Sequence, residues 1–220
     1  MRSHVCQFMH RSEEGLTLIE SLVAIVIIGI VLAAIAPPLL IAAATRVQNQ
    51  RTEQAMQLAQ GEINRIRLIV ERGSYEKAEL PPITNATSIK DAPPPTRDTN
   101  GYIANSAAIT VTRGFTVDID NNGSADFVVQ LFRKAGITSS GVENPNSTSS
   151  IPNAFQMGVR VYEYQAFQTG GSSALSTKRT LLRLTSQSNL QHPLAVLYTT
   201  VARNDLPMSL EEYRQLLNTN

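Results

Sequence analysis

Residues 13–40 read EEGLTLIESLVAIVIIGIVLAAIAPPLL, and this stretch decides how the chain begins. No residue from Leu22 to Ala44 is charged. A helix of that length covers about 35 Å at ~1.5 Å per residue, which is enough for a hydrocarbon core of roughly 30 Å. The leader holds Glu13 and Glu14, and the apolar run exceeds the ~15 residues of an ordinary signal peptide. We therefore expect a membrane-spanning helix.

Glu20 stands at the start of this apolar run. A carboxylate beside a membrane helix is costly and usually has a partner. If the chain is cut after Gly15, the new amine on Leu16 lies four residues before Glu20, about one helical turn away. Amine and carboxylate would then compensate within one chain or between neighbouring chains, and the second arrangement would set the register of an assembly. The alternative is that Glu20 simply lies at the level of the lipid headgroups.

EEGLTLIES resembles the class III signal of type IV pilins and pseudopilins, in which a glycine precedes the cleavage site and a glutamate follows it. The resemblance implies that a prepilin peptidase cleaves between Gly15 and Leu16 and methylates the new amine of Leu16. The family usually has phenylalanine at that first mature position, so Leu16 favours a pseudopilin or minor pilin. The match covers these residues: Gly15, Thr17, Leu18, Ile19 and Glu20.

Pro37 and Pro38 interrupt the apolar run. A proline inside a helix removes a backbone hydrogen bond and destabilises the helix by ~3 kcal/mol. Such breaks persist in membranes where packing satisfies the freed carbonyls. The resemblance implies a helix that kinks or locally melts here as the subunit leaves the bilayer and enters a filament.

Helix-forming residues continue beyond the apolar run. We expect a membrane-spanning or filament-core helix over 16–45, after a leader of 1–15, and an amphipathic continuation over 46–73. Gly73 follows Arg72 and suits a helix C-terminus. Apolar residues recur at three- and four-residue spacing, which predicts one buried stripe. They are Ala55, Ala59, Ile63, Ile66 and Val70.

The rest of the chain predicts a sheet domain. A Pro-rich loop over 74–107 is followed by a β-sheet domain over 108–204, with a polar mobile loop at 136–153 and a short C-terminal helix over 205–220. The expected fold is α+β and pilin-like, with the long helix packed on an antiparallel sheet. The strand-like runs are 108–113, 115–119, 127–132, 159–167, 179–184 and 195–201.

Residues 118–126 read DIDNNGSAD and match the first nine positions of a calcium loop, with oxygen ligands at alternate positions. Val129 replaces the bidentate glutamate of position twelve, which would weaken binding. The alternative is a β-hairpin turn at Asn122-Gly123, and such a turn can also hold an ion. Calcium sites in secretion pseudopilins support the calcium interpretation by analogy. The candidate ligands are Asp118, Asp120, Asn122, Ser124 (through its carbonyl) and Asp126.

Composition argues against several other functions. The formal net charge of +1 does not favour bulk binding of nucleic acid. Cys6 is the single cysteine and lies in the leader, while His192 is the single histidine after it. The sequence has no P-loop, Rossmann fingerprint or GxSxG motif, so we expect a protein that is not an enzyme.

The resemblance also implies partners and a place in the cell. Expected partners are other pilins or pseudopilins, the prepilin peptidase and an inner-membrane assembly platform. The chain would cross the inner membrane once, with its domain in the periplasm or outside, and then join a filament. The leader, the Pro-rich loop and the closing residues 193–217 resemble the pseudopilin of cyanobacterial hormogonium polysaccharide secretion, which implies polysaccharide export and gliding. Alternatives are a minor pilin for adhesion or DNA uptake and a non-polymerising, membrane-anchored periplasmic binding domain.

Overall fold

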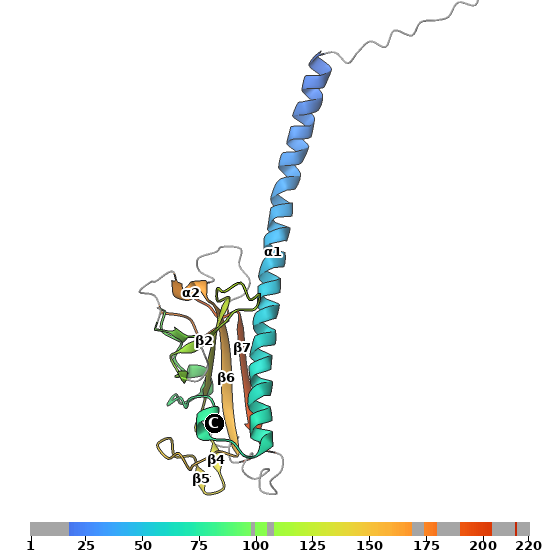
Figure 1. The fold of residues 1–220 in the computed structure, drawn as a ribbon. Helices are drawn as coiled ribbons and strands as arrows, with labels where there is room; N and C mark the ends of the chain where they lie inside the picture. Colours follow the sequence, from blue (N-terminus) through green and yellow to red (C-terminus); the bar gives the residue numbers. More distant parts are fainter. Residues whose placement is uncertain are drawn as a thin grey trace, which may run out of the picture. The chain divides into compact units, whose positions relative to one another are not determined.

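The computed structural model describes residues 18–97, 100–104, 108–168, 174–179, 190–203 and 214. They form a long helix, α1 (Leu18–Arg72), and a curled mixed sheet (Figure 1). The α+β, pilin-like architecture predicted from the sequence is confirmed. The predicted strand over 179–184, apart from Arg179, and the predicted C-terminal helix, apart from Arg214, lie outside the described residues. The chain divides into two units, residues 1–46 and 47–220, and α1 contributes to both.

In the first unit, α1 is exposed to its surroundings on every side. All residues from Leu18 to Ala44 are exposed, including large apolar side chains such as Ile25 at 71% and Leu40 at 72%. An apolar window of this helix has a mean hydropathy of 2.9, and by length and composition the helix can cross a membrane. Apolar side chains in such numbers are not stable in water, so this part of α1 requires lipid or protein around it.

In the second unit, the predicted buried stripe of α1 is confirmed. Ala55, Ala59, Ile66 and Val70 have no exposed surface, and Ile63 is 7% exposed. Ile69 joins them. These side chains form a common core with alternate residues of the sheet, so the helix is held mainly by packing rather than by helix propensity.

The helix ends at Arg72, and Gly73 follows as its C-terminal cap, as the sequence predicts. The backbone of Gly73 has φ 79°, and its amide donates to the Val70 carbonyl over 3.2 Å. This left-handed conformation closes the last turn and suits a residue without a Cβ.

Replacing Gly73 with alanine should destabilise the protein by about 1–2 kcal/mol, because a Cβ is unfavourable in the left-handed region. Gly61→Ala is the matched control, since a Cβ at Gly61 meets nothing within 4 Å and alanine favours a helix interior. Thermal unfolding of the full chain in detergent should show a lower Tm for the first variant and an equal or higher Tm for the second. A Gly73→Ala protein as stable as the parent would contradict this reading of the helix end.

The described sheet has seven strands in the order β1-β2-β3-β6-β4-β5, with β7 paired to β6. The β1–β2 pair is parallel and the others are antiparallel, so the expected antiparallel sheet is in fact mixed. β1 lies within the stretch expected to be Pro-rich loop, and a strand of two residues carries no detectable alternation. The strands are β1 (Tyr102–Ile103), β2 (Gly114–Val117), β3 (Phe127–Arg133), β4 (Ile137–Thr138), β5 (Gly141–Val142), β6 (Ala154–Glu163) and β7 (Ala195–Ala202).

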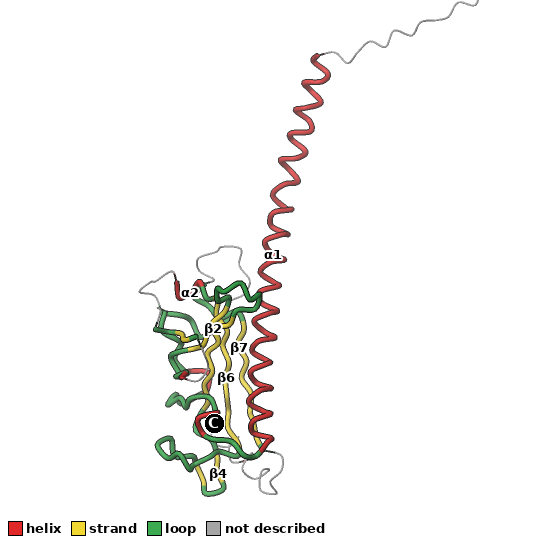
Figure 2. Tube along the Cα trace, in the orientation of Figure 1, coloured by secondary structure: helices red, strands yellow, loops and turns green. Residues whose placement is uncertain are grey.

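Both faces of the central strands are buried. Along β3, Val129 and Leu131 point into the core shared with α1, while Val128 and Phe132 belong to clusters on the other face. That second face is covered by loops, by the 3₁₀ turn η2 (Ile89–Asp91) and by the short helix α2 (Gln165–Gln168), as Figure 2 shows. A second 3₁₀ turn, η1 (Lys77–Glu79), follows α1. The Pro-rich stretch therefore contributes to the packed domain.

Two predicted strands differ from the structure. Residues 108–113 form a tight turn in which Thr110 and Arg113 exchange backbone hydrogen bonds. The Gln130 side chain donates to the Val111 carbonyl over 2.6 Å, which occupies a group that a strand would need. The run 159–167 is strand only as far as Glu163, and the residues from Gln165 onward form α2.

The stretch 136–153, expected to be a mobile loop, contains the β4–β5 hairpin. Ile137 pairs with Ala154 of β6, and Glu143 is buried immediately after the hairpin. The polar composition of this stretch gave no indication that one of its charged side chains, Glu143, anchors it to the domain.

Candidate functional site

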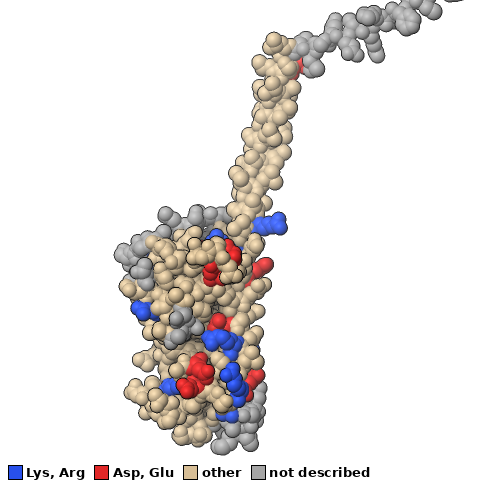
Figure 3. Space-filling view, in the orientation of Figure 1, with Lys and Arg blue, Asp and Glu red and all other residues tan. Residues whose placement is uncertain are grey.

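The first candidate site is the exposed, apolar half of α1. Figure 3 shows its visible surface almost free of charged side chains beyond the start of the helix. Glu20 is in the first turn and is exposed. The Ser21 hydroxyl donates to the Leu18 carbonyl over 2.8 Å. The predicted cleavage residues, Gly15 and Leu16, lie outside the described residues.

Pro37 and Pro38 lie inside α1, and the helix continues through both. Each proline lacks an N–H, so the carbonyls of Ala33 and Ala34 lose their usual helical donors. Thr45 follows with a side-chain hydrogen bond to the Ile41 carbonyl of 2.8 Å. The helix therefore has fewer backbone hydrogen bonds around Pro37 and Pro38. A kink or local melting of the helix there during assembly stays a prediction.

The second candidate site is the acidic turn, residues 118–126, which joins β2 to β3. One carboxylate oxygen from each of Asp118, Asp120 and Asp126 lies within 4.8 Å of the others. The Asp118 carboxylate accepts from the Gly123 amide over 2.9 Å, and the Asp126 carboxylate accepts from the Ile119 amide over 2.9 Å. The hairpin and the converging acids are therefore both present.

Asn122 and Ser124 have other roles in this turn. The Asn122 side chain donates to the Asp120 carboxylate over 2.8 Å, and its oxygen accepts from the Ser124 amide over 2.8 Å. Val129, at the twelfth loop position, is fully buried in the core shared with α1. A cation in this turn would thus rely chiefly on the three aspartates and on water.

Asp118 has the most unusual environment of the three acids. Its Oδ1 atom is buried and has no hydrogen-bond partner among the described residues. Desolvation would raise the pKa of Asp118, but hydrogen bonds from the Gly123 amide and neighbouring groups outweigh it and lower the pKa. An ionised, buried oxygen without a donor is the kind of ligand that a hard cation binds.

A third feature, an ionic cluster, was not predicted from the sequence. Arg133 donates to both carboxylate oxygens of Glu143, including a 2.8 Å contact from Nη2 to Oε1. Both side chains are almost completely buried. Lys77 Nζ lies 3.3 Å from Glu143 Oε1. It also donates to three backbone carbonyls in the loop that follows Glu143. The Gly136 amide donates to the Glu143 carboxylate over 2.9 Å. Arg133 lies at the end of β3 and Glu143 lies just after the β4–β5 hairpin, and no sequence pattern predicts that these two residues pair.

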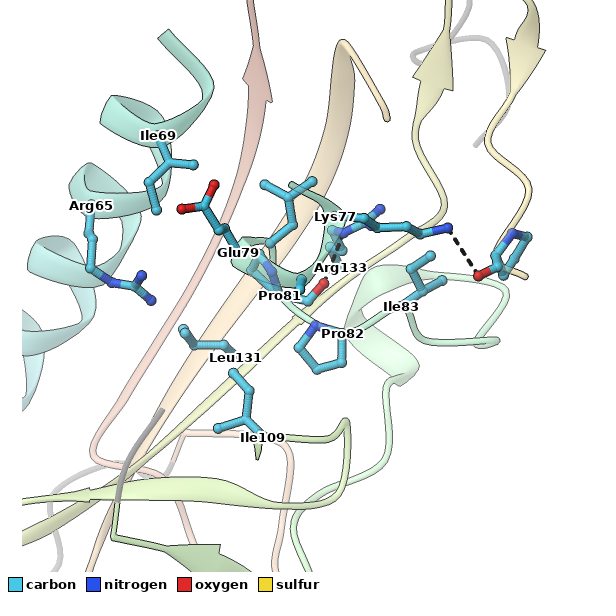
Figure 4. Close-up of a pocket in the computed structure, with 13 residues that line it drawn as sticks. Arg65, Ile69, Lys77, Glu79, Pro81, Pro82, Ile83, Ile109, Leu131 and Arg133 are labelled. Atoms are coloured by element: carbon cyan, nitrogen blue, oxygen red, sulfur yellow. Dashed lines mark hydrogen bonds between the residues drawn. The ribbon is translucent and has the colours of Figure 1, made fainter. Parts of the chain in front are cut away.

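A groove of about 640 Å³ lies beside this cluster (Figure 4). Arg65 and Ile69 reach it from α1, and Leu131 and Ile109 line it from the sheet side. Arg133, which also lines it, is paired with Glu143, and Arg65 is paired with Glu62 over 2.8 Å. Because its cations are already paired and it is open to solvent, the groove does not resemble an enclosed catalytic pocket.

His192, Tyr162 and Tyr164 have packing or surface roles in the described structure. His192 Nδ1 lies 2.8 Å from the Lys178 carbonyl oxygen. Tyr162 is fully buried and donates to the Ser176 carbonyl, and burial raises its pKa. The Tyr164 hydroxyl lies 3.1 Å from that of Tyr102, with the two rings edge to face.

The comparisons with known proteins bear on the N-terminus. Residues 10–36 match the family model described as the prokaryotic N-terminal methylation motif. No curated protein and no solved structure matches the chain. The matched residues include Gly15, Glu20 and the first part of the apolar helix.

This motif leads into a long helix that packs on a sheet, and the two features together support a type IV pilin-like protein. The motif and the apolar half of α1 together support a membrane anchor. Proteins that carry this motif are structural rather than enzymatic.

Proposed function

We propose that the protein is a pseudopilin or minor pilin, a structural subunit of a type IV pilus-like or type II secretion-like filament. The observation that carries the proposal is the methylation motif at residues 10–36, which runs directly into a helix with uncharged, exposed sides. A filament offers such a helix a place among identical helices once it leaves the membrane. The hydrophobic core shared by α1 and the sheet contains no residue of the apolar half.

In this proposal a prepilin peptidase cuts between Gly15 and Leu16 and methylates Leu16. Glu20 then pairs with the methylated amine of a neighbouring subunit and sets the axial register. Before assembly the chain crosses the inner membrane once, with its sheet domain in the periplasm. Its partners are other pilins or pseudopilins and the inner-membrane assembly platform. We further propose that the filament supports polysaccharide secretion and gliding, which rests on the resemblance of the leader, the Pro-rich loop and residues 193–217.

The principal alternative is a membrane-anchored binding domain that never polymerises. Expression of the full chain with and without a prepilin peptidase separates the two. A filament subunit should lose residues 1–15 only when the peptidase is present and should then appear in the sheared surface fraction. A chain that stays uncut and membrane-bound in both cells would support the anchored domain.

We also propose that the acidic turn, residues 118–126, binds calcium weakly. The supporting observation is the buried, unpartnered Oδ1 of Asp118 beside the carboxylates of Asp120 and Asp126. The missing twelfth ligand places the expected affinity at the weak end of the range for calcium loops, on the order of 10⁻⁴–10⁻³ M.

Calcium should therefore raise the Tm of the full chain in detergent, with about 2.7 kcal/mol of added stability at a hundredfold excess over Kd. Asp118→Asn should abolish the increase, because it removes the charge on the buried oxygen. Magnesium is the control ion, since it accepts such irregular sites poorly. Equal Tm values in calcium and in a chelator would contradict the proposal.

A further inference from the structure

Two side chains from the short connection after α1 bind the same loop, residues 143–153, which joins β5 to β6. The connection begins at Gly73 and continues through η1. The Tyr75 hydroxyl donates to the Pro152 carbonyl over 2.6 Å, and Tyr75 is buried. The Lys77 ammonium donates to three further carbonyls of the β5–β6 loop. They belong to Asn144 at 2.7 Å, Pro145 at 3.0 Å and Ser147 at 2.8 Å.

The middle of the β5–β6 loop has few other contacts. Most residues from 144 to 150 are exposed, and none belongs to a strand. The Ser147 amide donates to the Asn144 carbonyl over 3.2 Å, and the Asn144 amide donates to Ser150 Oγ over 3.1 Å. An exposed segment that lacks the hydrogen bonds of a sheet opens at little cost in free energy. Among the described contacts, Lys77 is what ties this part of the loop to another segment.

The charges around Glu143 explain why Lys77 binds carbonyls. One carboxylate lies beside two cations, and Arg133 donates to both of its oxygens. The positive charge of Lys77 is therefore balanced mainly by the carbonyl dipoles that converge on it. An ammonium has three N–H donors that can turn toward three acceptors, whereas a guanidinium is a planar fork. The arrangement of the three carbonyls thus suits lysine specifically.

We propose that Lys77 is a clasp that fixes the β5–β6 loop to the end of α1, so that the helix end and the loop move as one body. Figure 4 shows the Lys77 side chain extending from η1 with a hydrogen bond to this loop. Load applied along α1 then reaches the sheet through the clasp and the buried Glu143 as well as through the core. This load-bearing role rests on the proposed filament function, in which subunits hold one another through α1.

Lys77→Met tests the clasp because it removes the ammonium and keeps a long side chain. Hydrogen–deuterium exchange of the full chain in detergent is measured on peptides that cover residues 143–150. We expect exchange there to be at least about tenfold faster, which corresponds to about 1.4 kcal/mol of lost local stability. Lys134→Met is the matched control, since Lys134 donates to the Thr87 carbonyl of a different loop over 2.9 Å. It should leave exchange in the β5–β6 loop unchanged.

Two further variants separate a local clasp from general destabilisation. Ile63→Val weakens the core, so it should speed exchange in β3 and β6 but not in the loop, whose amides exchange by local opening. Lys77→Arg keeps a positive charge beside Glu143 but not the three-carbonyl geometry, so it should not restore slow exchange. Equal loop exchange in the parent and Lys77→Met would overturn the inference. So would faster loop exchange in Ile63→Val, or slow exchange in Lys77→Arg.

Single-molecule pulling tests the load-bearing role. Handles are attached at Val47→Cys and Val142→Cys, both exposed positions, in a chain whose single native cysteine is removed by Cys6→Ser. Lys77→Met should lower the force of the first unfolding step, and Lys134→Met should not. Faster loop exchange with an unchanged force would refute the load-bearing role. Neither measurement requires filaments, so absence of the parent chain from filaments would refute the proposed function and leave the clasp to these two results.

Discussion

Replacing Glu20 with alanine should reduce incorporation of the subunit into filaments by more than about a hundredfold. After cleavage the amine of Leu16 would lie about one helical turn from Glu20. In an apolar helix bundle, a charge that loses its partner costs several kcal/mol, and about 3 kcal/mol already corresponds to more than a hundredfold in an equilibrium. The membrane-bound pool should remain, because the substitution makes the helix more apolar.

Two controls separate loss of the charge from loss of the side chain or of the fold. Glu20→Gln keeps the size of the side chain and should fail nearly as completely. Glu53→Ala removes an exposed glutamate from the second half of α1 and should have little effect. Both proteins should have the parent's Tm. Normal incorporation of Glu20→Gln would show that Glu20 lies at the headgroup level without a role in assembly.

Replacing Glu143 with glutamine should destabilise the sheet domain by about 3–5 kcal/mol, because it leaves the buried Arg133 without its counter-ion. Glu62→Gln is the control, since its partner Arg65 is 42% exposed and such pairs contribute at most about 1 kcal/mol. Chemical unfolding of the full chain in detergent measures both. A Glu143→Gln protein within 1 kcal/mol of the parent, on the same order as the surface pair, would contradict the assigned role of the cluster.

The same pair predicts a pH dependence. Burial would raise the pKa of Glu143, but the hydrogen bond from Arg133, the Gly136 amide and the charge of Arg133 hold it below the usual value. The carboxylate therefore stabilises the fold fully above the unfolded pKa of about 4.3 and loses that effect as pH falls through the lower folded pKa. Glu143→Gln should flatten this acid limb of the stability curve.

The sequence predicted burial correctly where apolar residues repeat at helical spacing along a long helix. Ala55, Ile66 and Val70 follow the helical spacing over several turns, so their burial followed from the pattern alone. The strand expected at 108–113 failed because the Gln130 side chain and a neighbouring loop satisfy its backbone groups, which no local pattern reveals. For the same reason, the sequence did not predict the buried ion pair of Glu143, whose partners are Arg133, Lys77 and the Gly136 amide.

The two halves of α1 explain why the assembly and stability predictions are separable. Glu20 and the apolar half lie in one unit, while the core and the Glu143 cluster lie in the other. Changes in the first should alter assembly without changing the Tm of the domain, and changes in the second should do the reverse.

The most direct test of the account is the intact mass of this protein recovered from sheared surface filaments. We predict a chain that begins at Leu16, lacks residues 1–15 and carries one added methyl group. Detection of only the full-length, unmethylated chain, confined to the membrane of cells that possess the peptidase and form filaments, would contradict it.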